Sequence, residues 1–283
     1  MMQGTQQPAQ PALVGMSLPR QDGPDKVTGR TRYAGDQVLP GLLYARLVTS
    51  PYAHAGILNI NTSAALSVPG VVAVFTAETL GMAQTDLSSR SQSPLAQREV
   101  LWCGHPVAIV VGETEATAED GAAAVEVDYE PLPAVIDPEA AIRTDSPLVR
   151  SSSETREVAG GENATVPQEG RSQNVSQAPP LKMGDIEAGL REAELLVECS
   201  YRTHPVHQSY MEPQSVTVAP SLSGHHLVIW PSTQGMFNVR SAVAGSLNMP
   251  ERQIRVESVP SGGGFGGKET LLEPLAEFLH RRF

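Results

Sequence analysis

The sequence of 283 residues has few cysteines, few aromatic side chains and no excess of positive charge. The two cysteines, Cys103 and Cys199, are too few for a four-cysteine iron–sulfur cluster within this chain, and they give no sign of a disulfide framework. The formal net charge of −11 argues against nucleic acid or an anionic membrane surface as a partner. No uninterrupted apolar run approaches the roughly 18 residues of a transmembrane helix. We therefore expect no membrane partner and a location in the cytoplasm.

Glycine and proline are abundant instead, with 25 and 23 copies, which predicts many loops and short elements. Residues 1–19 are polar and lack the features of a signal peptide, so we interpret them as a flexible N-terminal arm. Residues 20–145 combine strand-like runs with a helix-forming stretch at 114–124, which predicts a compact α/β domain. Residues 146–180 are poor in large apolar side chains and are predicted to form a mobile linker. The strand-like runs of the domain are 42–49, 71–75, 107–111 and 125–129.

Residues 181–283 are expected to form a second domain of mixed helices and strands. Helices are predicted at 185–190 and 236–247. An amphipathic helix is predicted near the end of the sequence, because leucines recur there at a spacing of four. Since no further element follows to cover its apolar stripe, we expect this domain to be incomplete, either covered by another polypeptide or truncated. Strand-like runs lie at 195–202, 215–219 and 226–230, and the stripe consists of Leu271, Leu272, Leu275, Ala276 and Leu279.

The octet GGGFGGKE at residues 262–269 is the most informative motif in the sequence. Its glycines leave the backbone almost without side-chain cover, so its N–H groups can come close to a ligand. The preceding run, 253–259, alternates polar and apolar residues as a half-buried strand does. A strand, a glycine loop and a helix in this order predict a site that binds an anion.

Three interpretations of the glycine loop follow from spacing alone. Gly262, Gly264 and Gly267 satisfy the dinucleotide fingerprint, but the sequence ends before the acidic residue expected about 20 positions later. Gly262, Gly267 and Lys268 fit a phosphate-binding loop, but Glu269 replaces the hydroxyl residue that holds Mg²⁺. The third interpretation is a glycine-rich turn that binds no ligand.

Five further motifs accompany the octet: DKVTG at 25–29, YAGD at 33–36, SPYAHA at 50–55, GHPVA at 104–108 and WPSTQ at 230–234. Together with it, they resemble the signatures of the molybdenum hydroxylases, the xanthine dehydrogenase and aldehyde oxidoreductase family. The resemblance covers residues 17–283, which correspond to about the first third of the molybdopterin-binding large subunit. It implies an α+β fold, with an α/β-hammerhead-type N-terminal domain followed by an incomplete α/β molybdopterin-binding domain.

The resemblance also implies roles for individual residues. Gln234 resembles the glutamine that donates its amide to an oxo ligand of molybdenum, and its alternative is a polar residue facing solvent at a helix start. Glu269 resembles a residue that contacts heterocyclic substrates, and its alternative is an acid in the first turn of a helix. Lys268 could meet a phosphate or be solvated. The backbone of the loop is expected to bind the cofactor through Gly263, Gly264, Phe265, Gly266 and Gly267.

Metal ligands are not expected on this chain. His204 and His207 have a ligand spacing, with Glu212 nearby, but in a strand the two histidines point to opposite faces. The family has a similar segment whose residues are structural or line the pocket. The resemblance therefore implies no protein ligand to the metal.

The function implied is that of a molybdopterin-binding component of a multi-subunit hydroxylase, which oxidises a heterocycle or an aldehyde by water-derived hydroxylation. The cofactor is expected to be molybdenum–molybdopterin, in its cytosine dinucleotide form, with 2Fe-2S and FAD on partner subunits. A further chain is expected to carry the rest of the molybdenum subunit, including the general base, so this chain alone is expected to be inactive. The alternative is a truncated or degenerate protein that keeps the fold as an interaction module.

Overall fold

The structure is a computed structural model that describes residues 15–81, 95–149, 172, 174, 183–221, 223, 224, 226–269, 272–280, 282 and 283. Most of the predicted N-terminal arm and most of the predicted linker therefore lie outside the described residues. Within the described part, no helix has the length and apolar character needed to cross a bilayer.

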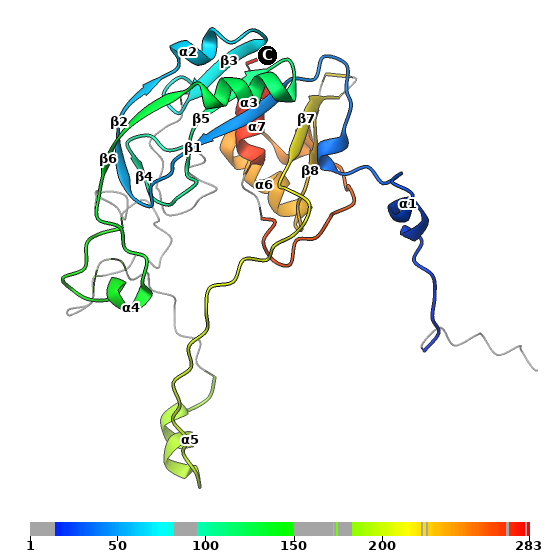
Figure 1. The fold of residues 1–283 in the computed structure, drawn as a ribbon. Helices are drawn as coiled ribbons and strands as arrows, with labels where there is room; N and C mark the ends of the chain where they lie inside the picture. Colours follow the sequence, from blue (N-terminus) through cyan, green and yellow to red (C-terminus); the bar gives the residue numbers. More distant parts are fainter. Residues whose placement is uncertain are drawn as a thin grey trace, which may run out of the picture.

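An N-terminal unit consists of two small antiparallel sheets (Figure 1). The first sheet has the order β1-β5-β3 and the second the order β4-β2-β6. The predicted strands are confirmed, with shifts of one or two residues at their ends. The strands are β1 (Tyr44–Thr49), β2 (Ala55–Asn61), β3 (Val71–Thr76), β4 (Glu99–Val100), β5 (Pro106–Gly112) and β6 (Glu126–Pro131).

The apolar run of β5 is buried because it lies in the middle of its sheet and is covered by helix α3 (Glu115–Ala123). Thr114 caps this helix by accepting a hydrogen bond from the backbone N–H of Thr117 at 3.1 Å. Gly121 lets the helix approach the sheet, since a Cβ at this position would lie 2.7 Å from both Val110 and Val71. The other short helices of this region are α1 (Gly23–Val27), η1 (Ala34–Asp36), α2 (Ser63–Leu66) and α4 (Pro138–Ala141).

A C-terminal unit contains a third sheet of order β7-β8-β9, in which β8 and β9 run parallel. Helix α6 (Met236–Leu247) packs on it, with Val239, Val243 and Leu247 buried, and Asn248 ends this helix in the left-handed conformation. The glycine octet follows β9 and precedes α7, as the sequence predicts. The remaining elements are α5 (Ile186–Glu192), β7 (Val216–Pro220), β8 (Leu227–Pro231), η3 (Glu251–Gln253), β9 (Ile254–Val256) and α7 (Glu273–His280).

The prediction of a strand at 195–202 is wrong. These residues are extended and exposed, and they pair with no strand among the described residues. An alternating pattern indicates a face that can be buried, but it does not supply a neighbouring strand to bury it.

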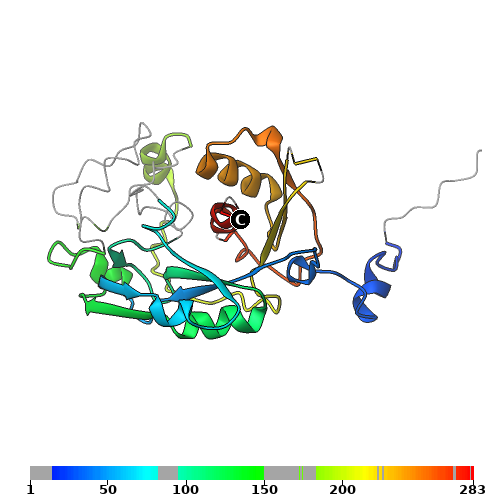
Figure 2. The same ribbon diagram turned by 90° about the horizontal axis from the view of Figure 1, so that it is seen from above.

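Helix α7 corrects the reason given for an incomplete second domain, because this chain itself covers Leu275 and Leu279 of the apolar stripe. Leu275 and Leu279 are buried in one cluster with Leu80, Ile109 and Val111 of the N-terminal unit. Figure 2 shows α7 between α6 and the sheets of that unit. The helix therefore joins the two units into one packed body.

Replacing Leu275 by alanine is expected to lower the free energy of unfolding by about 2–5 kcal/mol, because the side chain is buried between the units. The matched control is Leu58→Ala on β2, where the side chain is 67% exposed and the cost should stay within about 0.5 kcal/mol. Urea unfolding of both variants measures the difference. Equal stability of the two variants would show that α7 is not packed in this way.

Candidate functional site

The glycine loop has a backbone that few other residues could adopt. Gly263 and Gly266 have φ angles of 102° and 84°, and Phe265 lies between them with a φ of 50°. The Phe265 side chain is 74% exposed. Left-handed conformations are costly for residues with a Cβ, so the glycines at these positions are required by the backbone itself.

Other glycines of the loop are required by packing against this chain's own side chains. A Cβ at Gly262 would lie 2.5 Å from Glu212, and one at Gly264 would lie 2.6 Å from the amide carbon of Gln234. A Cβ at Gly267 would lie 2.9 Å from Gln208 and from Tyr210. At Gly266, by contrast, a Cβ would have no described atom within 4 Å. The open side of the loop is therefore at Gly266.

Gln234 is tied to the loop through its side-chain carbonyl. Its Oε1 atom accepts hydrogen bonds from the backbone N–H of Gly266 at 2.9 Å and of Lys268 at 3.4 Å. Its own backbone N–H donates to the Lys268 carbonyl at 3.1 Å. Because both side-chain partners are N–H donors, the atom facing them must be the oxygen. The Nε2 group points elsewhere and donates no hydrogen bond to the described part of the chain.

The loop amides are thus partly used within the protein. The N–H of Gly266 is bonded to Gln234, and the N–H of Gly267 donates to the Gly264 carbonyl at 2.7 Å. Gln214 donates to the Gly267 carbonyl at 3.1 Å. The loop is therefore held in shape before any ligand binds.

Lys268 is neither solvated nor exposed to a phosphate, in contrast to both sequence-based interpretations. Its side chain is fully buried and forms an ion pair with Glu212. The Glu212 Oε2 atom also accepts a hydrogen bond from the Gly262 N–H at 2.7 Å, and the Tyr210 ring centroid lies 5.1 Å from Lys268 Nζ. The pair therefore fixes both ends of the loop.

The pairing of Glu212 with Lys268 is the contact that sequence reasoning missed. Glu212 belongs to a segment that the resemblance describes as structural or pocket-lining, but nothing in its local sequence connects it with Lys268, 56 positions later. Its Oε1 atom is buried and has no hydrogen-bond partner among the described residues. The described residues of the chain contain no cluster of three or more side chains that could bind a metal ion.

Glu269 is exposed and follows the buried Lys268. The alternative that it belongs to the first turn of the following helix is wrong, because α7 begins at Glu273. Glu273 occupies that first turn and is buried. Glu269 therefore projects from the loop, where a ligand could reach it.

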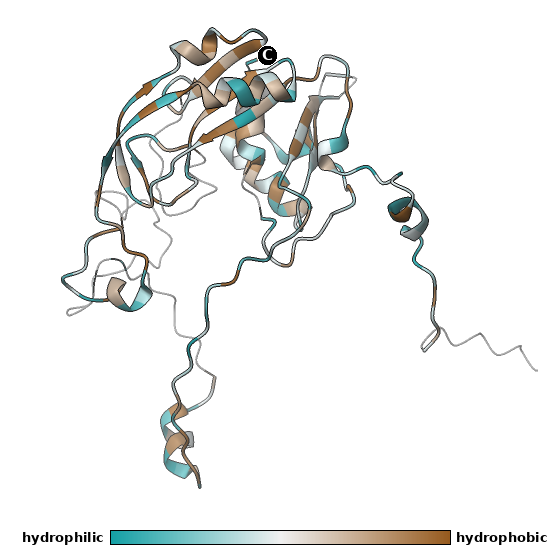
Figure 3. Cartoon of the chain, viewed as in Figure 1, coloured by the Kyte–Doolittle hydropathy of each residue, from teal (hydrophilic) through white to brown (hydrophobic). Residues whose placement is uncertain are grey.

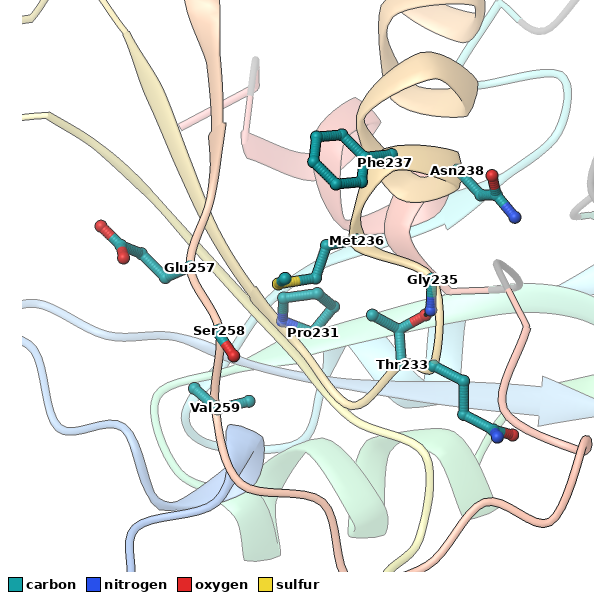
Figure 4. A pocket seen from close by; sticks show the side chains of 10 residues that line it. Pro231, Thr233, Gly235, Met236, Phe237, Asn238, Glu257, Ser258 and Val259 are labelled. Atoms are coloured by element: carbon teal, nitrogen blue, oxygen red, sulfur yellow. Dashed lines mark hydrogen bonds between the residues drawn. The ribbon is translucent and has the colours of Figure 1, made fainter. Parts of the chain in front are cut away.

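A pocket of about 380 Å³ lies at the carboxyl ends of β8 and β9, in front of the start of α6 (Figure 4). In open sheets with parallel strands, ligands bind preferentially at this edge. Gln234 belongs both to the pocket wall and to the set of contacts that holds the glycine loop. The wall consists of Pro231, Thr233, Gln234, Gly235, Met236, Phe237, Asn238, Glu257, Ser258 and Val259.

Two protein-family models match the chain. "Aldehyde oxidase and xanthine dehydrogenase, a/b hammerhead domain" matches residues 28–133. "Molybdopterin cofactor-binding domain" matches residues 167–281, which include the glycine loop and Gln234. The chain folds accordingly, as a hammerhead domain followed by part of a molybdopterin-binding domain.

Individual relatives agree with these matches. The chain is 35% identical to a xanthine dehydrogenase molybdenum-binding subunit of Escherichia coli O157:H7, over 92% of this chain and 33% of that protein. It is 27% identical to the nicotinate dehydrogenase large molybdopterin subunit of Eubacterium barkeri, over 90% of this chain and 56% of that protein. The solved structure of reconstituted CO dehydrogenase from Oligotropha carboxidovorans superposes with a TM-score of 0.78 at 30% identity, over 94% of this chain and 34% of that one. The chain thus spans about a third of most of these relatives.

Proposed function

Since the chain belongs to the xanthine dehydrogenase and aldehyde oxidoreductase family of molybdenum hydroxylases, we propose that it forms one wall of a molybdopterin site. The complete enzyme would be a multi-subunit oxidoreductase that hydroxylates a heterocycle or an aldehyde with oxygen from water. The rest of the molybdenum subunit, an iron–sulfur subunit and an FAD subunit would complete it. The cofactor would carry a cytosine dinucleotide.

The observation that carries the proposal is the position of Gln234. Its carbonyl oxygen holds the loop, so its Nε2 group is left to donate a hydrogen bond to a ligand, and the residue itself lines the pocket. A neutral donor held in place by a rigid loop can bind an anionic oxygen without adding a competing charge. The residues present therefore fit a ligand rich in anionic oxygen atoms.

The glycine loop fits the same ligand. Its backbone near Gly266 is bare, and a Cβ at that position would point into open space rather than into the protein. A bulky, planar cofactor can approach such a backbone closely, whereas a side chain would keep it away. The N–H groups of Gly264 and Phe265 form no hydrogen bond to the described residues and can serve as donors toward it.

When bound, the molybdenum centre supplies the two-electron oxidation of the substrate carbon. The residues of this chain would bind and orient the cofactor and the substrate. Gln234 would donate to an oxygen atom of the cofactor, the loop backbone would position the cofactor, and the exposed carboxylate of Glu269 would contact the substrate. The general base would come from the part of the large subunit that this chain does not span.

Replacing Gln234 by alanine is expected to lower kcat of the assembled enzyme by about 10²-fold, as for one lost oxyanion-hole donor. The rate is measured per bound molybdenum, so that loss of cofactor does not count as loss of rate. The matched control is Gln214→Ala, which removes one side-chain hydrogen bond to the loop, where Gln234→Ala removes two, but takes no residue from the pocket wall.

The Gln214→Ala enzyme should keep its rate per molybdenum. Equal losses in the two variants would mean that Gln234 acts only by holding the loop. An assembled wild-type complex without molybdenum would instead favour the alternative, an interaction module that does not catalyse.

A further inference from the structure

Lys268 and Gln234 are joined through the backbone of the lysine. The Lys268 carbonyl accepts a hydrogen bond from the Gln234 backbone N–H at 3.1 Å, and the Lys268 N–H donates to the Gln234 Oε1 atom at 3.4 Å. The Gly266 N–H donates to the same oxygen at 2.9 Å. A carboxamide group is planar, so the position of its oxygen also fixes the direction in which its Nε2 group donates. The position of the Lys268 backbone therefore decides where that donor points.

The side chain of Lys268 is anchored at the start of the loop. Its Nζ atom pairs with Glu212 Oε2, which also accepts the hydrogen bond from the Gly262 N–H at 2.7 Å. The two ends of the loop thus meet at one oxygen atom. The Glu212 backbone N–H adds a hydrogen bond to the Gly262 carbonyl at 3.4 Å. Hydrogen bonds between charged groups are shorter and stronger than neutral ones, so this anchor restricts the Lys268 backbone closely.

The anchor lies on the closed side of the loop, which residues 208–212 cover. A Cβ at Gly267 would lie 2.9 Å from Tyr210, and the ring centroid of Tyr210 lies 5.1 Å from Lys268 Nζ. The open side of the loop is at Gly266. The Lys268 side chain is fully buried, so it cannot contact a ligand itself. Any effect of this lysine on a ligand has to pass through the residues to which it is bonded.

Stability alone does not explain a lysine at this position. Replacing a buried ion pair by apolar side chains of similar volume is often neutral or stabilising, because taking two charges out of water offsets the gain from their attraction. A methionine could fill the volume of Lys268 without that cost. What a methionine lacks is the bond to Glu212, which fixes the backbone next to Gln234.

We propose that Lys268, held by Glu212, is a positioning residue for Gln234. It sets the direction in which the Gln234 amide donates a hydrogen bond to an anionic oxygen of the cofactor. This role rests on the function proposed above. Loss of the ion pair should therefore act on Gln234 in particular and not on the fold as a whole.

Hydrogen exchange of the full chain, without cofactor, provides the first test. The variant Lys268→Met/Glu212→Gln, here called the neutral variant, removes both charges at similar volume. The two amides to follow are the backbone N–H groups of Gln234 and Gly266, which donate to the Lys268 carbonyl and to Gln234 Oε1. In the neutral variant both should exchange about tenfold faster, as for the loss of one hydrogen bond. Unchanged exchange of both amides would overturn the proposal.

A reference amide and a control variant separate this local effect from a general loss of stability. The reference is the amide of Ile229, which is fully buried in β8, a strand of apolar residues (Figure 3). In the neutral variant it should change less than the amides of Gln234 and Gly266 do. The control variant, Val107→Ala, removes buried apolar volume from the N-terminal unit and should leave those two amides within about twofold of wild type.

The assembled enzyme provides the second test. The neutral variant should lower kcat per bound molybdenum about tenfold, because a misdirected donor stabilises the transition state less well. In the Gln234→Ala background the same change should lower kcat less than about twofold, since no amide is left to position. A purely structural role predicts the same factor in both backgrounds, and that result would overturn the proposal.

The two tests also distinguish this proposal from the proposed function. An active enzyme that contains molybdenum, with unchanged exchange at Gln234 and Gly266 in the neutral variant, refutes the positioning role alone. A wild-type complex that never takes up molybdenum refutes the proposed function. The exchange test needs no cofactor, so it still decides whether the ion pair holds Gln234 in place.

Discussion

Lys268→Ala is expected to lower the free energy of unfolding of the chain by about 3–5 kcal/mol, the usual cost of removing one member of a buried ion pair. The substitution leaves the Glu212 carboxylate in place, with its side chain only 10% exposed and its positive partner gone. The carboxylate would then be buried without a compensating positive charge. Urea unfolding, followed by the fluorescence of the two tryptophans, measures the change.

Two controls separate this effect from a general loss of packing. The double variant Lys268→Met/Glu212→Gln removes both charges at similar volume and should lose less stability than the single variant. Arg143→Ala breaks an ion pair with Asp145 whose side chains are 67% and 68% exposed, and it should change the stability far less, because solvent screens an exposed pair. A Lys268→Ala protein as stable as the Arg143→Ala protein would contradict a buried pair at the base of the loop.

The local elements could be predicted because their signals lie within a few residues of each other. Helix α6 occupies the predicted range 236–247, since an apolar stripe between Gly235 and Asn248 marks both of its ends. The glycine octet predicts a bare loop after a strand, and the φ angles of Gly263 and Gly266 agree with it. The roles of Gln234, Glu269 and the loop glycines as cofactor or substrate ligands stay predictions.

The contacts that hold the site could not be predicted, because they join residues far apart in the sequence. The ion pair of Glu212 and Lys268 spans 56 positions, and the bond from Gly266 to Gln234 spans 32. No local pattern distinguishes a buried lysine from a solvated one. The burial of Leu275 under β5 was missed for the same reason, since an amphipathic stripe does not identify the surface that it packs on.

Gly266→Val is expected to give a complex that assembles but loses most of its molybdenum. A valine there would have to adopt a φ of 84°, and its side chain would project into the open space beside the loop. The first effect costs about 1–2 kcal/mol for a left-handed residue, which a packed protein can tolerate. The second would keep the cofactor from approaching the backbone. The complex should therefore lose most of its molybdenum, while the chain loses only this small part of its free energy of unfolding.

Gly41 offers a matched control. It also has a positive φ, of 73°, and a Cβ there would likewise have no described atom within 4 Å. It lies between η1 and β1, outside the loop and the pocket. Gly41→Val therefore imposes similar backbone strain without a side chain at the proposed cofactor wall.

Molybdenum analysis of the purified complexes tests directly whether the glycine loop is the wall of the cofactor site. We expect stoichiometric molybdenum in the wild-type and Gly41→Val complexes and little in the Gly266→Val complex, with all three assembled to the same extent. Full molybdenum occupancy in the Gly266→Val complex would contradict the account, because the cofactor would then bind without a close approach to this loop.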